Sequence, residues 1–441
     1  MKPRILLLTF YYPPDLSAGS FRVEALVNAL RTKLGDEVEI DIITTTPNRY
    51  NSYVTEAESF ERISTVNVRR ITVPRHKGFI GQAYAFAIFA LRVLSQIKKS
   101  RYDLVFATSS RLMTALLGAI VSRKAKAPLY LDIRDIFAET VPDLFPYIVG
   151  KPIALFFSML ERWTIKSATR VNLISPGFTP YFEGRYPGVE FTTFTNGVDE
   201  IFLEKNSSPQ FLPPNLETVR KRILYAGNIG TGQGLDLIIP SLAKQLEQQA
   251  EFHIIGAGGT LKKLETAISL SKVTNVIIHP PMNRTELLEK YDEADILFLH
   301  LNDFKAFRRV LPSKLFEYAA SQKPIWAGLS GFSARFARNS IRNIALFKPC
   351  DIESAISAFY NLELRATPRQ EFIKQYSRPL IKIEMAKDII STSSCLNDLY
   401  RKNTDNASQE GTKESRNTDF LNKDSNAENA RQSPQYRQPQ L

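Results

Sequence analysis

The sequence predicts an α/β protein made of two domains that each contain a parallel sheet. Short apolar runs alternate with helical patterns in both halves of the chain, which is typical of parallel strands covered by helices. The chain has 441 residues, more than a single hydrophobic core usually serves. A polar segment with three prolines, residues 205–219, separates the halves and is predicted to be a linker.

The first predicted domain spans residues 1–204. Strands are predicted where apolar residues run together or alternate: 4–10, 38–44, 66–73 and 103–108, and the runs PLYL, VNLIS and FTTFT. Apolar residues at helical spacing predict helices in the segment that follows Ser20 and over residues 79–97, 113–121 and 150–166.

The second predicted domain spans residues 220–377 and repeats the alternation. Its strands are predicted at ILYA, EFHII, NVIIH, DILFLHL and PIWAG, and its helices at LDLIIPSLAKQL, LKKLETAISL, RTELLEKYDEA and LPSKLFEYAA. One more helix is predicted over residues 378–400. Residues 401–441 are rich in Asn, Gln, Ser and charge, so they are predicted to form a disordered tail.

The positive charge is concentrated in one part of the first domain. The formal net charge is +12, and residues 60–130 hold 13 Lys and Arg against the two acids Glu61 and Asp103. Such a block suits an anionic partner, which can be nucleic acid, anionic lipid or a phosphorylated substrate. Nucleic acid is the weakest of these, because the block lies inside an α/β domain without a known binding motif.

The sulfur and imidazole side chains give no sign of a metal or disulfide site. Cys350 and Cys395 have no metal-ligand spacing, and the four histidines are scattered. A reducing, cytoplasmic compartment is the simplest expectation. The opening run RILLLTFYY is shorter than a secretory signal core, and no apolar run reaches about 18 residues, so neither a signal peptide nor a transmembrane helix is predicted.

Two apolar helices in the first domain allow two interpretations. Residues 79–97 and 150–166 are rich in aromatic residues, and each is followed by or ends in basic residues. They can be ordinary core helices, or they can lie at a membrane surface with basic ends toward anionic lipid. The surrounding excess of positive charge leaves both interpretations open.

The stretch VLPSKLFEYAASQKPIWAG, residues 310–328, is the strongest candidate for a binding site. Pro312 suits the first turn of a helix, and Leu315, Phe316 and Ala319 form its buried face. A helix N-terminus followed by a lysine and by Glu317 can receive an anion and sugar hydroxyls. An ordinary amphipathic helix with the same start fits the spacing equally well.

Two groups in the first domain are further candidates. Gly19 and Ser20 precede a helix, so their backbone N–H groups can face a phosphate, although a tight turn explains them equally well. Asp132, Arg134 and Asp135 follow a buried strand. Sites in open α/β sheets gather at the carboxyl ends of strands, which makes these charges site candidates.

Seven segments together resemble the retaining glycosyltransferases of family 4. They appear in that family's order: TFYYPPDLSAGSFR, TNGVD, YAGNIGTGQGL, HIIGAGG, NVIIHPPMNRTEL, ADILFLHL and LPSKLFEYAASQKPI. The most similar subgroup is the one resembling WbuB, sugar transferases of O-antigen and capsule assembly, and the resemblance spans residues 4–395. It implies a GT-B fold, with two Rossmann-like domains facing across a cleft. The sugar nucleotide would lie on the second domain and the acceptor on the first, and the last helix would cross back.

The resemblance implies a role for individual residues. Glu317 would hold the donor ribose, Lys314 would face the diphosphate with Pro312 and Ser313, and Asp135 would orient the acceptor hydroxyl. The remaining donor contacts would come from Gly19, Ser20, Gly227, Asn228, Gly230, Met282, Asn283 and Arg284. No metal and no cofactor is expected, because no Asp-x-Asp is present and the fold's chemistry is metal-independent.

The sequence departs from the family pattern at three positions. Arg309 stands where many relatives have a first glutamate that contacts the donor sugar. Asn228 and Gln233 stand where relatives have an Arg and a Lys that neutralise the diphosphate. A leaving diphosphate needs its charge stabilised. Lys314, Arg308 and Arg309 are the available replacements, and Arg309 and Lys314 join Asp135 as candidate catalytic residues.

These observations predict a retaining glycosyltransferase. The donor is expected to be a UDP-linked sugar, N-acetylated, and the acceptor a lipid-linked or oligosaccharide chain of a cell-surface polysaccharide. The first domain would lie on the inner leaflet of the cell membrane as a peripheral protein. Two alternatives remain: a catalytically silent relative that acts as a scaffold, which the missing Arg and Lys suggest, and a sugar-nucleotide epimerase.

Overall fold

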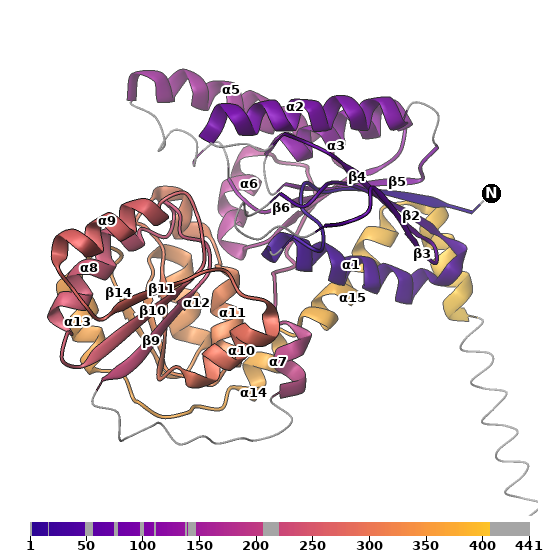
Figure 1. Ribbon diagram of the computed structural model, residues 1–441. Helices are drawn as coiled ribbons and strands as arrows, with labels where there is room; N and C mark the ends of the chain where they lie inside the picture. Colours follow the sequence, from indigo (N-terminus) through magenta and orange to yellow (C-terminus); the bar gives the residue numbers. More distant parts are fainter. Residues whose placement is uncertain are drawn as a thin grey trace, which may run out of the picture.

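The computed structural model consists of two α/β domains that lie side by side (Figure 1). It describes residues 2–15, 17–48, 56–74, 78–97, 101–109, 112–136, 139, 147–205 and 220–405. Most of the predicted linker, 206–219, and residues 406–441 of the predicted tail lie outside the described residues. Each domain contains one sheet with helices on both faces, so the predicted α/β class with two Rossmann-like parallel sheets is confirmed.

The N-terminal domain is built on an eight-stranded sheet in the order β3-β4-β2-β1-β5-β6-β7-β8. Its strands are β1 (Arg4–Leu8), β2 (Glu39–Thr45), β3 (Phe60–Ile63), β4 (Val66–Ile71), β5 (Leu104–Ser109), β6 (Leu129–Ile133), β7 (Arg170–Leu173) and β8 (Phe191–Thr192). All pairs are parallel except β3 with β4. The sequence did not predict β3, because FERI alternates charge with apolar residues and lies exposed at the sheet edge.

Helices cover both faces of this sheet and enclose two separate apolar cores. The helices are α1 (Ala18–Leu34), α2 (Gly78–Gln96), α3 (Leu112–Ala125), α5 (Tyr147–Lys166) and α6 (Thr179–Arg185), with 3-10 turns η1 (Gly35–Glu37) and η4 (Pro176–Phe178). In Figure 1, α2, α3 and α5 lie above the sheet, whereas α1 lies below it. The central strands are buried on both faces, which explains their continuous apolar runs.

The C-terminal domain has a six-stranded, fully parallel sheet in the order β11-β10-β9-β12-β13-β14. The strands are β9 (Lys221–Ala226), β10 (Ala250–Ile255), β11 (Val276–His279), β12 (Ile296–His300), β13 (Ile325–Gly328) and β14 (Ile344–Phe347). The helices are α8 (Leu235–Gln245), α9 (Leu261–Ser271), α10 (Arg284–Glu293), α11 (Ser313–Ala320), α12 (Gly331–Ser340), α13 (Ile352–Tyr360) and α14 (Gln370–Gln375), with the 3-10 turn η5 (Lys305–Arg309).

Both sheets reverse their winding beside their first strand, between β1 and β5 and between β9 and β12. In open α/β sheets, ligands bind outside the carboxyl ends of the strands at this reversal. The loops that follow β1 and β9 lead into α1 and α8, and the loop after β12 leads to η5 and α11. The topology therefore points to these loops as the place of a site.

Two elements link the domains besides the linker. One is α7 (Glu200–Lys205), and the other is α15 (Arg378–Ser391), which begins beside Val198, where Arg378 N–H donates to the Val198 carbonyl (2.8 Å). From there α15 returns to the N-terminal domain, where Met385 and Ile389 belong to the core under α1. A second helical segment follows over residues 394–405, so the predicted start of the tail at 401 is wrong. Its apolar residues, such as the buried Leu396, still pack on the core.

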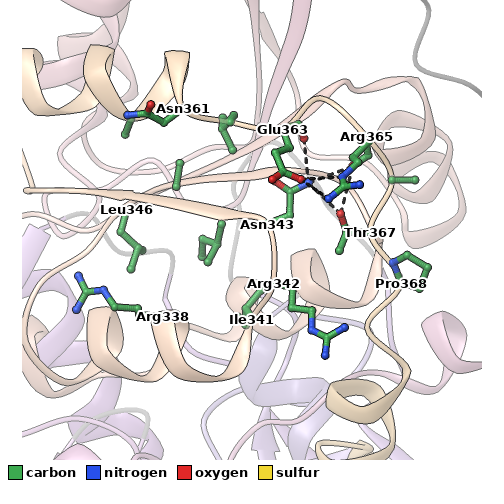
Figure 2. Close-up of a pocket in the computed structure, with 15 residues that line it drawn as sticks. Arg338, Ile341, Arg342, Asn343, Leu346, Asn361, Glu363, Arg365, Thr367 and Pro368 are labelled. Carbon is green, nitrogen blue, oxygen red and sulfur yellow. Dashed lines mark hydrogen bonds and ion pairs between the residues drawn. The ribbon is translucent and has the colours of Figure 1, made fainter.

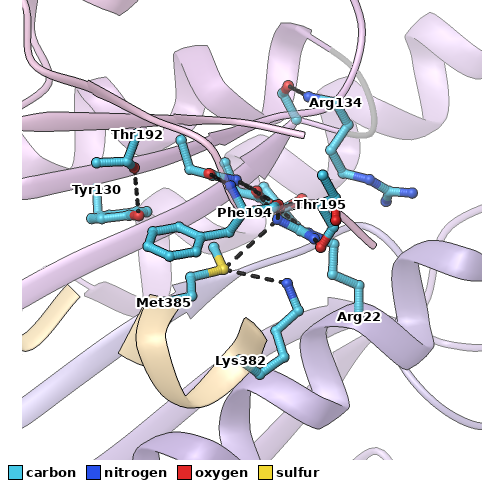
Figure 3. A network of polar contacts seen from close by, with 12 residues as sticks. Arg22, Tyr130, Arg134, Thr192, Phe194, Thr195, Lys382 and Met385 are labelled. Atoms are coloured by element: carbon cyan, nitrogen blue, oxygen red, sulfur yellow. Dashed lines mark hydrogen bonds and ion pairs between the residues drawn. The ribbon is translucent and has the colours of Figure 1, made fainter. Parts of the chain in front are cut away.

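A buried ion pair joins α1 to β6, and its arginine also lies 3.7 Å from the sulfur of Met385 on α15 (Figure 3). Arg22 from α1 and Asp132 from β6 form a bidentate pair with N–O distances of 2.9 and 2.7 Å, and both are almost fully buried. Arg22 also donates to the carbonyls of Phe194 and Thr195, each at 2.8 Å. Burial alone would raise the pKa of Asp132, but Arg22 holds this pKa below its ordinary value, so the carboxylate stays charged.

We predict that Asp132→Asn destabilises the protein by about 3–5 kcal/mol, because it leaves the Arg22 guanidinium buried without its counter-charge. Chemical denaturation measures this change. Lys387→Ala is the control, since Lys387 forms an ion pair with Glu384 near the surface of α15 and its loss should leave stability unchanged. If the two variants unfold at the same denaturant concentration, the pair does not hold the domain.

Candidate functional site

A cleft of about 450 Å³ lies between the two domains at the ends of both sheets. Ser17, Ala18, Phe21, Arg134, Asp135, Ile174 and Asn196 line it from the N-terminal domain. The C-terminal side includes most of the predicted site residues, namely Gly227, Asn228, Met282, Arg284, Pro312, Ser313, Lys314 and Glu317. Residues more than 100 positions apart in the chain thus meet at the place that the topology indicates.

Glu317 lies on α11, one turn after Ser313, and is held by two side chains. Its Oε2 accepts from Lys314 Nζ at 2.7 Å and from the Tyr291 hydroxyl at 3.1 Å. Burial would raise the pKa of Glu317, but Lys314, with Arg378 and Arg284, lowers it below its ordinary value. The carboxylate is therefore ionised and fixed, so it can accept hydrogen bonds from two ligand hydroxyls.

The turn after β9 has no charged side chains at the positions 228 and 233. Asn228 Nδ2 donates to Gln233 Oε1 (2.9 Å), and the same oxygen accepts from Gly230 N (3.2 Å). This hydrogen-bonded pair fixes the turn but adds no positive charge to the cleft. A Cβ on Gly230 would lie 2.6 Å from Asn228 Nδ2, so Gly230 packs behind this pair and does not line the cleft.

A neighbouring glycine turn supports the same loop. Gly256 has φ +149°, and a Cβ there would lie 1.9 Å from the Gly227 carbonyl oxygen. A Cβ on Gly258 would lie 2.2 Å from the carbonyl oxygen of Ile229. Only glycine allows the two turns to approach this closely, and the approach fixes the backbone of the turn after β9.

His300, the last residue of β12, was not among the predicted site residues. Its Nδ1 lies 2.6 Å from the Gln233 carbonyl oxygen and its Nε2 accepts from Cys350 N at 3.0 Å. Burial lowers the pKa of His300 to about 4, so the imidazole is neutral, and its Nδ1–H donates to the Gln233 carbonyl oxygen. The signal available in the sequence was its position at the carboxyl end of a central parallel strand.

Three predicted donor contacts have other structural roles. Gly19 and Ser20 lie in the first turn of α1, where Ser17 Oγ caps the helix by accepting from Ser20 N (3.1 Å), and Ser20 itself is buried. Asn283 caps α10 through a capping box with Glu286. Since an amide that caps a helix has its acceptor occupied, the cleft is lined on this side by the neighbouring residues Met282 and Arg284.

Arg309 does not line the cleft and instead connects the two domains. Its Nε donates to Glu139 Oε2 (3.1 Å), and its carbonyl accepts from Ser175 Oγ (2.6 Å). Arg308 forms an ion pair with Asp303 at the surface, 2.9 Å apart. The predicted replacements for the missing cations are therefore already paired with acids, as Lys314 is with Glu317.

Asp135 and Arg134 follow β6 and face the cleft from the N-terminal domain. Burial raises the pKa of Asp135 to about 6, although Arg134 acts in the opposite direction. Because a carboxyl group with this pKa titrates near neutral pH, Asp135 can both accept and donate a hydrogen bond to a hydroxyl. This pair lies on the N-terminal wall of the cleft, and Arg284, Lys314 and Glu317 lie on the C-terminal wall.

Two models of glycosyltransferase domains match the sequence. The glycosyl transferase 4-like domain matches residues 19–196, and the glycosyl transferases group 1 domain matches residues 210–378. The chain belongs to the group 1 glycosyltransferases. Members of this family transfer a sugar from a nucleotide-sugar donor, and the two matches coincide with the two domains that line the cleft.

Solved structures confirm the GT-B fold of this glycosyltransferase. HepE from Anabaena, in complex with UDP-glucose, is 15% identical over 92% of this chain and 99% of its own, with a TM-score of 0.54. WaaG, a glycosyltransferase of lipopolysaccharide biosynthesis, is 15% identical over 91% and 98%, with a TM-score of 0.55. Trehalose 6-phosphate synthase from Burkholderia multivorans is 12% identical over 92% and 100%, with a TM-score of 0.57.

No curated protein sequence matches this glycosyltransferase significantly. The matches therefore establish the family and the fold, and they do not single out the subgroup that resembles WbuB. In the described part of the chain, no three His, Cys, Asp or Glu side chains are grouped so that they could hold a metal ion.

A second hollow, of about 930 Å³, lies beside the edge strand β14 (Figure 2). Three of its polar residues bond to one another: Arg365 Nε donates to Glu363 Oε2 (2.7 Å), and Asn343 Nδ2 donates to the carbonyls of Glu363 and Arg365. These contacts hold a surface loop in place. The interdomain cleft, where fixed charges from both domains converge, is therefore the candidate site.

We predict that Asp135→Asn raises the melting temperature at pH 7. The pKa of Asp135 is about 6 in the folded protein, whereas the ordinary pKa of an aspartate is 3.8. The stability that the protonated group contributes is therefore fully present below pH 3.8 and is lost as the pH rises through 6. Asn removes this loss, so the gain at pH 7 should vanish near pH 4. Thermal unfolding at both pH values measures it.

Asp398→Asn is the control for this prediction, since the Asp398 side chain is exposed on the last helical segment and its replacement should leave both melting temperatures unchanged. An Asp135→Asn gain of equal size at pH 4 and pH 7 would show that the carboxyl group is not perturbed.

Proposed function

We propose that this glycosyltransferase retains the anomeric configuration and transfers a sugar, N-acetylated, from a UDP-linked donor to a lipid-linked or oligosaccharide acceptor of a cell-surface polysaccharide. The observation that supports this most directly is Glu317. It is an ionised carboxylate fixed by Lys314 and Tyr291 in the cleft, opposite Asp135. A fixed acceptor of this kind suits the two hydroxyls of a ribose.

The donor nucleotide would lie along the C-terminal wall of the cleft. Glu317 would accept from the ribose hydroxyls, and the base would lie against Pro281 and Met282, which line the same wall. The N-terminus of α11, at Pro312 and Ser313, would place its partial positive charge on the diphosphate. The bound UDP-glucose of HepE, a protein of the same fold, is consistent with a UDP donor.

The acceptor would approach from the N-terminal wall, with its hydroxyl beside Asp135. In the transfer, the acceptor oxygen forms a bond to the anomeric carbon while the bond from that carbon to the diphosphate breaks. The acceptor proton passes to a phosphate oxygen of the leaving UDP on the same face, so the step needs no separate base. Asp135 would orient the hydroxyl, and the fixed dipoles of the cleft would stabilise the charge on UDP.

We predict that Glu317→Gln weakens UDP binding by about 10- to 100-fold. A charged hydrogen bond contributes about 1.5–3 kcal/mol, and the neutral amide loses this charge. Calorimetric titration of UDP measures the effect, and a sugar-transfer assay should show the same loss in kcat/KM. Glu265→Gln, an exposed glutamate on α9, is the matched control and should leave binding unchanged.

The outcomes of these assays separate the alternatives. A wild-type protein that binds none of the UDP-, GDP- or ADP-sugars and transfers none of them would be a silent, scaffold-type relative. A product sugar nucleotide formed without any acceptor would identify an epimerase. Donor binding that is unchanged in Glu317→Gln would contradict the proposed ribose contact.

We also propose that the N-terminal domain lies on the inner leaflet of the cell membrane as a peripheral protein. In the described residues no helix is long and apolar enough to span a membrane. However, α5 exposes Leu155, Phe156 and Met159, whose exposed fractions are 66, 58 and 65%, and α2 exposes Leu91. Both helices cover the face of the domain that points away from the C-terminal domain (Figure 1).

The two interpretations of α2 and α5 therefore apply to different faces of the helices. Phe89 and Val93 of α2 and Ile165 of α5 are buried in the core, whereas the opposite faces carry the exposed apolar residues. Arg162 of α5 is exposed as well. An apolar face with basic residues is the pattern of a helix that rests in a lipid interface.

We predict that the wild-type protein floats with vesicles that contain anionic lipid and that Leu155→Glu/Met159→Glu stays in solution, because two carboxylates would enter the interface. Vesicle flotation measures this. Leu237→Glu/Leu270→Glu is the matched control, because these leucines on α8 and α9 of the other domain are also exposed, at 56 and 79%, and it should float like the wild type. If the wild type fails to float at any salt concentration, the membrane proposal is wrong.

A further inference from the structure

The diphosphate of a donor bound as proposed would need positive charge that the C-terminal wall supplies only in part. Two fixed positions on that wall, Asn228 and Gln233, are neutral and bonded to each other. The nearby cations already form ion pairs: Lys314 with Glu317, Arg284 with Asp199, and Arg309 with Glu139. Since a leaving diphosphate gains charge in the transition state, further positive charge is expected from the opposite wall.

The guanidinium of Arg134 lies on that opposite wall, directly over the first turn of α1. A Cβ built on Gly19 would lie 2.2 Å from Arg134 Nη1 and 3.2 Å from its Cζ. Because Gly19 has no side chain, the Arg134 guanidinium fits into the space that a Cβ would fill. Arg134 and Ser17, the N-cap of α1, both line the cleft, so a planar cation and the positive end of a 17-residue helix coincide there.

A buried lysine lies near Arg134, although it does not line the cleft. Lys382 of α15 is fully buried, and its ammonium points toward Arg22 and Thr195 (Figure 3). Its Nζ lies 3.4 Å from the Met385 sulfur, and it forms no ion pair within the described part of the chain. Burial lowers the pKa of Lys382. Arg22, Arg378 and Arg134 lower it further, and Asp132 acts in the opposite direction. These effects favour the neutral amine, and an anion bound nearby would favour the protonated form.

We propose that Arg134 binds the diphosphate of the nucleotide-sugar donor from the N-terminal domain. Gly19, at the start of α1, leaves room for its guanidinium. This inference rests on the proposed donor binding in the cleft. The diphosphate would then lie between two helix N-termini, those of α1 and α11, with Arg134 as its bidentate partner. Donor binding would join the two walls, because the ribose contacts Glu317 of one domain and the phosphates contact Arg134 of the other.

The test compares the affinity for UDP with the affinity for uridine, which lacks the phosphates. Arg134→Gln should weaken UDP binding by at least about tenfold and leave uridine binding unchanged, since it removes a charge-assisted phosphate contact only. Glu317→Gln should weaken both ligands, because both contain the ribose. Calorimetric titration at two salt concentrations should also show a smaller salt dependence for Arg134→Gln.

Gly19→Ala gives an independent test. Gly19 lies in a helix without a positive φ, so alanine suits the backbone, yet its Cβ would displace the guanidinium. Gly19→Ala should weaken UDP binding as Arg134→Gln does, and the double variant should bind UDP no more weakly than Arg134→Gln alone.

Wild-type affinity for UDP in Arg134→Gln would overturn the inference while leaving the proposed function intact. If the KM for the acceptor is raised in the same variant, Arg134 contacts a phosphate of the acceptor instead. If the wild-type protein binds neither UDP nor uridine, it is the proposed donor site itself that fails.

Discussion

The buried pair of Arg22 and Asp132 is the interaction on which the architecture of the site depends. Arg22 belongs to α1, Asp132 to β6, and the carbonyls of Phe194 and Thr195 complete the guanidinium's contacts. Asn172 of β7 donates to the same carboxylate at 2.6 Å. A charge taken out of water is tolerated only when it is paired and fully hydrogen-bonded. These segments therefore have one favourable arrangement, and α1 starts at a fixed place in the cleft.

A second buried carboxylate connects this arrangement to the other domain. Asp199 forms ion pairs with Arg284 of α10 and with Arg378 at the start of α15, and Arg378 Nε also donates to the Asn196 carbonyl at 3.0 Å. Arg284 in turn lies 4.4 Å from the centre of the Phe21 ring on α1. The walls of the cleft are thus joined by charged contacts near the site, so a ligand that changes the local charge also acts on the contact between domains.

The sequence predicted what depends on chain-local patterns. The alternation of strands and helices, the helix that contains Glu317 and the glycine turn after β9 all follow from spacing and turn chemistry. It did not predict which side chains occupy each other's hydrogen bonds. Asn283 caps its helix, Arg309 pairs with Glu139, and Lys314 pairs with Glu317. His300 and the position of Arg134 over Gly19 depend on contacts between residues far apart in the chain, which periodicity does not encode.

The most direct measurement is a crystal structure of the full chain with UDP. We expect the ribose hydroxyls to lie within hydrogen-bond distance of the Glu317 carboxylate and the diphosphate to lie between the N-termini of α1 and α11. A nucleotide bound outside the interdomain cleft, for example in the hollow beside β14, or one whose ribose has no contact with Glu317, would contradict it.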